Sequence, residues 1–87
     1  MNLTKNQSKI LLKLIDMDGC YRKEIEKSLK MNLKSFHDSL VRLILNEAVR
    51  SEVIKAKGNP HKIYLTDYGK VLLDSIKRVD NYAKKYT

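Results

Sequence analysis

Apolar residues recur at helical spacing in three segments of the first half of the chain. The first segment carries its apolar residues on one face, at Ile10, Leu11, Leu14 and Ile15. Before it, Thr4 and Gln7 stand in a capping-box relationship, in which each side chain binds the other residue's free backbone amide. We therefore predict a helix over residues 4–16, which ends at the turn residues Met17-Asp18-Gly19.

Two further helical segments follow Gly19 and lie close together in the sequence. Ile25 and Leu29 form the inward pair of a short helix predicted over residues 22–30. Asn32 is suited to cap the next helix, because its side-chain oxygen can accept a hydrogen bond from a first-turn amide. That helix is predicted over residues 33–46, with a one-sided apolar stripe at Phe36, Leu40, Leu43 and Ile44.

The pattern then changes from helical to extended. From Val49 to Lys57, β-branched residues stand among polar ones without a capping signal, which predicts a strand. Gly58-Asn59-Pro60-His61 has the composition of a turn, and Lys62 to Leu65 predicts a returning strand. We expect a two-stranded hairpin, or wing, over residues 49–65.

A heptad-like series closes the sequence after Thr66, which is placed to cap a helix. Its members alternate in spacing between three and four residues: Leu65, Tyr68, Leu72, Ser75, Val79, Tyr82 and Tyr86. The series predicts a helix over residues 67–86, about 30 Å long at 1.5 Å per residue. So long a helix extends beyond the rest of a small domain, and a second copy of it is the natural cover. We therefore expect a homodimer whose interface includes Leu72, Val79, Tyr82 and Tyr86.

The predicted order of elements is helix, helix, turn, helix, hairpin and long helix. Two short helices joined by a tight turn and followed by a hairpin are typical of a winged helix-turn-helix. We predict one domain over residues 1–87, mainly α with a two-stranded β-hairpin wing (class α+β) and a long C-terminal dimerisation helix.

Two runs of residues carry a resemblance to a known family. The first run is Glu24-Ile25 through Leu29, Leu33 to Leu43, and Ala48-Val49-Arg50, similar to the family's E-I-A-x-x-L helix and the recognition helix after it. The second is the YLTDYGKVLL segment from Tyr64 to Leu73, which resembles Y-x-L-T-x-x-G-x-x-L-L with one residue fewer after the tyrosine. Both runs resemble small winged-helix transcriptional regulators of bacteria and archaea, of the MarR and PadR type. The chain departs from the family's small or glycine residues at Lys30-Met31-Asn32 and at Glu47.

The resemblance implies double-stranded DNA binding by a symmetric dimer, with the recognition helix in the major groove and the wing on the neighbouring backbone or minor groove. The residues that it places at the DNA-facing side of the recognition helix are Lys34, Ser35, His37, Asp38 and Arg42, and Val41 lies on the same side. Lys34 would read guanine, Ser35 either kind of base and Asp38 a cytosine amino group. Alternatively, Asp38 and Arg42 form an intrahelical ion pair. Arg42 has a further interpretation as a phosphate contact, and Ser35 has one as a helix-capping residue.

The charges agree with a polyanionic partner. The chain has 18 Lys and Arg against 10 Asp and Glu, a formal net charge of +8. Basic charge gathers on two separate elements, as expected for a duplex contacted at two places. The predicted phosphate contacts before the recognition helix are Arg22, Lys23, Lys27 and Lys30, and the predicted wing contacts are Lys55, Lys57, Asn59, His61 and Lys62.

Other classes of function lack a supporting pattern. No nucleophile–base arrangement, paired carboxylates or phosphate-binding glycine loop is visible, so we do not expect an enzyme or a cofactor. His37, His61 and Cys20 lack metal-ligand spacing, so no metal is expected. A lone cysteine and the absence of an apolar span or signal-peptide core favour the cytoplasm over a membrane. A chain of 87 residues also leaves little room for an effector pocket, so no small-molecule effector is expected.

The leading hypothesis is a homodimeric regulator, a repressor that occupies an inverted-repeat operator by placing two recognition helices in successive major grooves. An architectural or replication-linked protein with little sequence preference is the first alternative. It is favoured by the small share of arginine, four of the 18 basic residues, because lysine contacts phosphate as a point charge. A winged-helix module that contacts an acidic protein is the second alternative.

Overall fold

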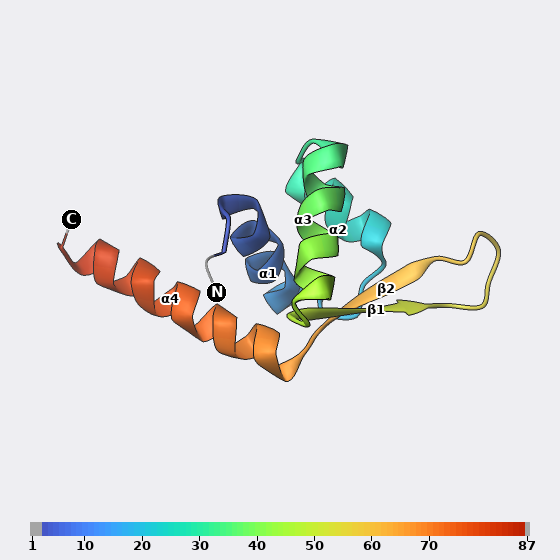
Figure 1. Cartoon of the computed structure of the whole chain (residues 1–87). Helices are drawn as coiled ribbons and strands as arrows, with labels where there is room; N and C mark the ends of the chain where they lie inside the picture. Colours follow the sequence, from blue (N-terminus) through green and yellow to red (C-terminus); the bar gives the residue numbers. More distant parts are fainter. Residues whose placement is uncertain (1–2, 87) are drawn as a thin grey trace.

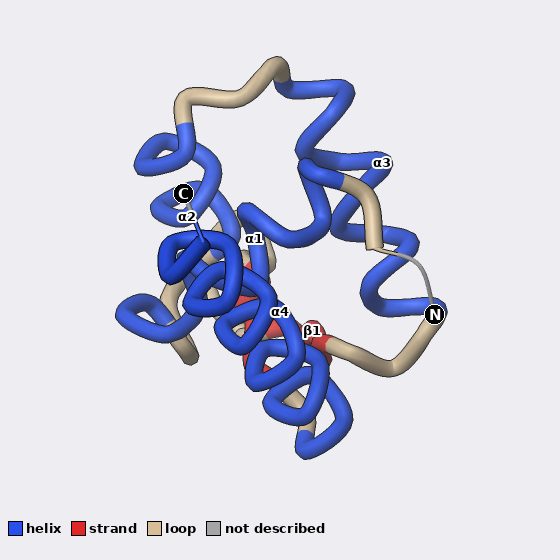
Figure 2. The backbone as a smooth tube through the Cα atoms, turned by 90° about the vertical axis from the view of Figure 1, so that its left-hand side faces the viewer, coloured by secondary structure: helices blue, strands red, loops and turns tan. Residues whose placement is uncertain are grey.

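The computed structural model describes residues 3–86 of the chain, and their side chains as far as residue 78. Its elements are α1 (Lys5–Met17), α2 (Arg22–Leu29), α3 (Leu33–Leu45), β1 (Val49–Val53), β2 (His61–Leu65) and α4 (Asp67–Tyr86). The hairpin and α4 extend in opposite directions from the group formed by α1, α2 and α3 (Figure 1). In the perpendicular view, α4 comes toward the viewer in front of α1 and the hairpin (Figure 2). The predicted winged helix-turn-helix order is confirmed.

Three of the helices begin at side-chain caps that the sequence indicated. The Thr4 hydroxyl oxygen accepts a hydrogen bond from the Gln7 amide at 3.1 Å, and the Gln7 side-chain oxygen accepts one from the Thr4 amide at 3.3 Å. Asn32 Oδ1 accepts from the amides of Lys34 at 2.9 Å and Ser35 at 3.3 Å. Thr66 Oγ1 accepts from the amide of the third residue of α4 at 3.0 Å. These bonds satisfy amides that have no partner inside the helix.

A single hydrophobic core lies where the three N-terminal helices meet the hairpin and the start of α4. Its buried members are Ile10, Leu11, Leu14, Ile25, Phe36, Leu40, Leu43, Ala48, Val49, Ile63 and Leu73. The prediction that Ile15 faces inward is wrong, because its side chain is 45% exposed. Gln7 takes the buried position on this face of α1, since the capping box satisfies its side-chain oxygen.

The two strands pair antiparallel, with Val49 opposite Leu65 and Val53 opposite His61. The prediction that the first strand continues to Lys57 is wrong, as is the assignment of His61 to the turn. One further bond joins the Ile54 amide to the Pro60 carbonyl at 2.8 Å. The ladder stops there because proline has no backbone N–H and Asn59 has a positive φ of 44°.

The loop before α2 joins the hairpin as a short third edge. The Gly19 amide donates to the Ile63 carbonyl at 2.7 Å, and the Ile63 amide donates to the Cys20 carbonyl at 3.0 Å. Tyr21 forms an isolated antiparallel bridge with Lys62. This pairing fixes the position of the first turn of α2 relative to the wing.

Two non-glycine residues adopt left-handed backbone angles at the points where the chain departs from the family pattern. Lys30 ends α2 with φ 52°, and Glu47 follows α3 with φ 61°. Such angles favour glycine because a Cβ atom crowds the backbone there. Neither of these departures prevents the fold. No helix in the described part of the chain combines the length and apolarity needed to cross a membrane.

Candidate nucleic-acid interface

The face of α3 opposite the core is open to solvent. Phe36, Leu40 and Leu43 point into the core, so the residues about half a turn away face outward. The exposed residues on the outer side of this helix are Leu33, Lys34, His37, Asp38, Val41, Arg42 and Leu45, while Ser35 is half-buried. Four of the five predicted base-facing residues are therefore exposed on α3, and the fifth is partly so.

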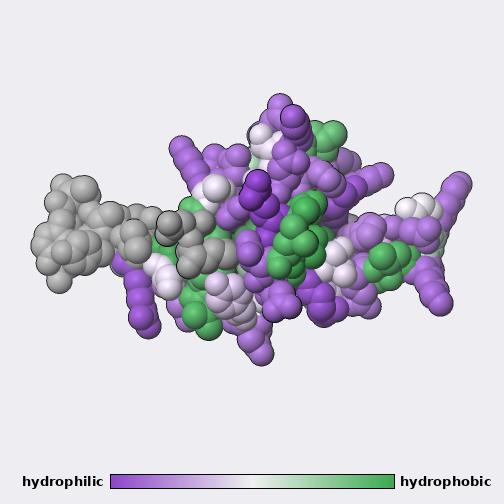
Figure 3. Space-filling view, in the orientation of Figure 1, coloured by the Kyte–Doolittle hydropathy of each residue, from purple (hydrophilic) through white to green (hydrophobic). Residues whose placement is uncertain are grey.

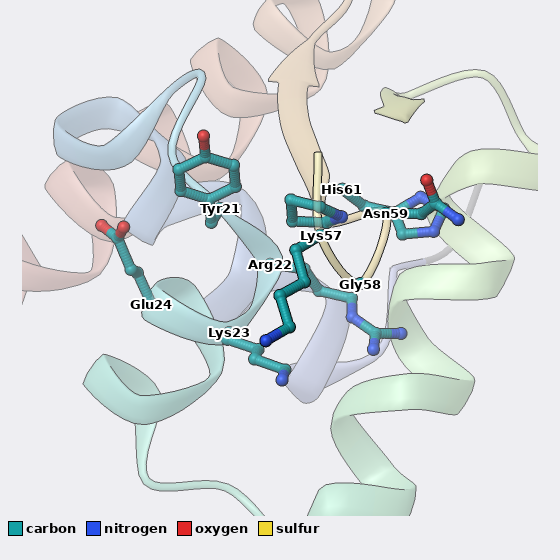
Figure 4. Close-up of a pocket in the computed structure, with 9 residues that line it drawn as sticks. Tyr21, Arg22, Lys23, Glu24, Lys57, Gly58, Asn59 and His61 are labelled. Carbon is teal, nitrogen blue, oxygen red and sulfur yellow. The ribbon is translucent and has the colours of Figure 1, made fainter. Parts of the chain in front are cut away.

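A cleft of about 510 Å³ separates the first turn of α2 from the tip of the wing. Figure 4 shows the side chains of Arg22, Lys23 and Lys57 in the space between these two elements, with Glu24 at one edge and Asn59 at the other. The cleft brings together five predicted DNA contacts: Arg22, Lys23, Lys57, Asn59 and His61. Residues from α2 and from the wing, more than 30 positions apart in the sequence, thus share one surface.

Two residues connect this cleft to the outer face of α3. Arg22 also lines a neighbouring hollow of about 460 Å³ together with Lys34 and His37. His37 in turn lines a third hollow of about 530 Å³, together with Asp38 and Arg42. The three hollows therefore form one continuous path from the wing tip past the start of α2 to the far end of α3.

The path carries more positive than negative charge. Its cations are Arg22, Lys23, Lys34, Arg42 and Lys57, and its carboxylates are Glu24, Glu26 and Asp38. Within the part of the chain whose side chains are described, the one ion pair joins Arg50 to Glu52 at 3.2 Å, on β1. The alternative pairing of Asp38 with Arg42 is therefore not formed, and the cations of the path are not neutralised by direct ion pairs. These cations can therefore interact with a polyanion.

Comparison with solved structures places this arrangement among known folds. MarR superposes with a TM-score of 0.88 at 19% identity, covering 98% of this chain and 62% of that one. BpsR of Bordetella bronchiseptica gives 0.85 at 18% identity, with 97% and 64% covered. SSV1 F-93 gives 0.75 at 21% identity, with 100% and 98% covered. The chain has the winged helix-turn-helix fold of MarR-type regulators.

The extent of these matches differs. The chain spans about three fifths of the length of MarR and BpsR, but nearly all of F-93. The DNA binding of BpsR is regulated by 6-hydroxynicotinic acid. No protein-family model and no curated protein sequence matches the chain. In winged-helix terms, α3 occupies the position of the recognition helix and β1–β2 that of the wing.

Several predicted contacts lie outside the path that joins recognition helix and wing. Lys27, Lys30 and Lys55 are exposed but line none of the three hollows. Lys62 is half-buried on the wing, with its Nζ 5.3 Å from the ring centroid of Tyr21. This cation–π contact directs its charge toward the wall of the cleft.

The predicted dimerisation residues stand differently. Leu72 is half-buried and packs against the domain's own core. The side chains of Val79, Tyr82 and Tyr86 lie outside the described residues. Their role remains a prediction from the heptad spacing.

Two aromatic residues of the winged-helix surface were not predicted from the sequence. Tyr21 lines the cleft and supports Lys62, and Tyr64 lies under the Arg50 guanidinium, 4.5 Å from ring centroid to carbon. His61 is also oriented by a contact across the hairpin, 3.0 Å between its Nδ1 and the Ser51 hydroxyl. Tyr21 stands next to Arg22 in the sequence, and Arg50 is paired with Tyr64 across the strands. Such pairs of an aromatic and a basic residue are a weak sequence signal for a binding surface, and the second pair is recognised only when the strand register is known. Among the described residues, no three potential metal ligands come together.

Proposed function

We propose that this chain is a double-stranded DNA-binding transcriptional regulator that acts as a homodimer in the cytoplasm. The recognition helix α3 enters the major groove, and the wing reaches the flanking backbone or minor groove. The observation that carries this proposal is the position of Arg22. Its side chain lines both the cleft at the wing and the hollow beside Lys34 and His37, so one basic surface joins the two DNA-contacting elements.

The mechanism that fits this surface is occlusion of a promoter. A dimer would present two copies of α3 to successive major grooves, about 34 Å apart along the duplex, and would favour an inverted repeat. Phosphate contacts from Arg22, Lys23 and the wing would fix the register, and base contacts from Lys34 and Asp38 would provide selectivity. The protein would then repress by excluding the transcription machinery from the same DNA.

A mobility-shift titration tests this function. The protein is titrated against a duplex from its own upstream region, with random duplex of equal length as competitor, at two salt concentrations. We expect a preference of about a thousandfold or more for the upstream DNA. The absence of binding to either duplex at low salt would contradict DNA binding and favour the contact with an acidic protein. Adding 6-hydroxynicotinic acid, which regulates BpsR, is expected to leave the shift unchanged.

Non-specific DNA coating is the second candidate, and the composition of the basic path favours it. Three of the five cations of the path are lysines, at positions 23, 34 and 57. Lysine binds phosphate without the bidentate geometry that arginine brings to guanine. Tight, salt-sensitive binding with equal affinity for both duplexes would support this candidate over the regulator.

A further inference from the structure

The outer face of the recognition helix carries large apolar side chains that the core does not cover. Leu33 is 64% exposed, Val41 38% and Leu45 76%. With His37 they form a row with a spacing of four residues, which follows one side of α3. Figure 3 shows hydrophobic surface over α3, surrounded by hydrophilic surface. Exposing these groups to water is unfavourable, so a partner that covers them gains affinity.

Val41 occupies the central position on this face. It lies two turns after Lys34 and on the same side of α3, because seven residues complete almost two turns of a helix. It also lines the hollow formed with His37, Asp38, Arg42 and Leu45. Its apolar side chain is therefore surrounded by groups that can contact base edges or phosphates.

The charges around Val41 indicate which partner can cover this face of α3. Arg42 and Asp38 line the hollow together with Val41, Lys34 lies two turns before it on the same side of α3, and the basic path continues to Arg22. With Lys34 and Arg42 against Asp38, this face has an excess of positive charge, so a duplex complements its charge better than a second copy of α3 does. A duplex instead offers phosphates to the cations. In its major groove, the apolar group on the base edges is the C5 methyl of thymine.

We propose that Val41 contacts a thymine methyl group in the major groove and makes the protein select thymine at that position. This inference rests on the proposed DNA binding and adds a specificity-determining residue to it. Polar groups on the same face, Lys34 and Asp38, would read neighbouring pairs. The preferred site would then contain a thymine at a fixed position in each half-site.

Substitution of deoxyuridine for thymine tests the contact, because it removes the methyl group and leaves base pairing and hydrogen-bonding groups in place. Duplexes that the wild-type protein prefers are selected from a random pool, and each thymine is then replaced singly. We expect about a fourfold loss of affinity at one position of each half-site, the value of one buried methyl group. The other thymines should tolerate the change.

The Val41→Ala variant tests the same contact from the side of the protein. It should bind the thymine duplex more weakly and distinguish thymine from deoxyuridine at the sensitive position less than the wild type does, because its shorter side chain makes a smaller apolar contact. Its salt dependence should match that of the wild type, because no phosphate contact is removed. Val71→Ala is the matched control, since Val71 is a 60% exposed valine on α4, and it should retain the discrimination.

The outcomes separate the inference from the function on which it rests. If every deoxyuridine replacement is neutral while the selected duplex remains preferred, the Val41 contact is refuted and the regulator stands. Discrimination in Val41→Ala that equals that of the wild type also refutes it. Tight binding without any selectable sequence refutes the contact and favours the coating protein, and the absence of binding refutes both proposals.

Discussion

A Cβ atom placed on Gly69 would collide with the carbonyl oxygen of Ala48. The backbone of Gly69 therefore packs closely against the Ala48 carbonyl, which brings the first turn of α4 onto the residue before β1. The Ala48 carbonyl also accepts hydrogen bonds from the Thr66 amide at 3.2 Å and the Thr66 hydroxyl at 3.0 Å. The glycine in the YLTDYGKVLL segment is thus explained by close packing, because Gly69 is not among the residues with a positive φ.

Replacing Gly69 by alanine should destabilise the protein strongly. The added methyl group must displace backbone rather than a flexible side chain, and we expect the free energy of unfolding to fall by about 3 kcal/mol. Urea denaturation followed by circular dichroism measures the change. Gly58→Ala is the control, because a Cβ there meets nothing within 4 Å and only the positive φ opposes it, at about 1 kcal/mol. A smaller loss at position 69 than at position 58 would contradict the packing argument.

Replacing Glu47 by glycine should stabilise the protein. Glu47 has a φ of 61° and is exposed, so removing its Cβ relieves about 1 kcal/mol of backbone strain. Its carbonyl, which accepts a hydrogen bond from the Thr66 hydroxyl, is kept. Glu47→Ala retains a Cβ and should give no such gain. Equal stability of the glycine and alanine variants in thermal melts would show that the strain is absent.

Replacing Arg22 by alanine should weaken DNA binding more than any replacement on the far side of the molecule. Arg22 connects the wing cleft to the face of α3, and losing one phosphate contact should reduce the slope of log affinity against log salt by about 0.9. Lys57→Ala should have a similar effect from the wing. Lys77→Ala, on α4, removes the same single positive charge and serves as the control. Fluorescence anisotropy across a salt series supplies the slopes, and an unchanged slope for Arg22→Ala would remove it from the interface.

The proposed homodimer predicts a dependence of stability on protein concentration. If the heptad residues Val79 and Tyr82 pack against a second copy, the unfolding midpoint should rise with concentration. Sedimentation equilibrium should give twice the chain mass. Replacing both residues by lysine should yield a monomer with weaker DNA binding, because two half-sites are no longer bound together. A monomeric wild type at micromolar concentration would refute the dimer.

The elements could be predicted from the sequence wherever a cap and an apolar face agreed. Thr4 with Gln7, and Asn32 with the stripe from Phe36 to Leu43, predict both ends of their helices to within one residue. The predicted end of the first strand is wrong. The prediction follows β-branched residues that continue to Ile54, whereas the partner strand cannot pair past Pro60. Strand length depends on the opposite chain, which local pattern does not reveal.

The sequence predicts several residues of the candidate site but not how they come together. The charge pattern predicts Arg22 and Lys57 separately, and the cleft that they share depends on the pairing of Tyr21 with Lys62 across 41 positions of sequence. The same pairing places Lys62 against an aromatic ring. Contacts between distant segments carry no periodic signal in a single sequence, so they emerge only from the folded chain.

The early end of the strand ladder divides the wing into two parts with different evolutionary freedom. Its base, from Val49 to Val53 and from His61 to Leu65, is paired, and it contributes Val49 and Ile63 to the core. Its tip from Lys55 to Asn59 is exposed and adds nothing to that core. Insertions and substitutions at such a tip are tolerated by folded domains. Descendants of this chain can therefore lengthen, shorten or recharge the tip, and under the proposed function this would change which DNA they contact, while the rest of the domain stays under unchanged selection for folding.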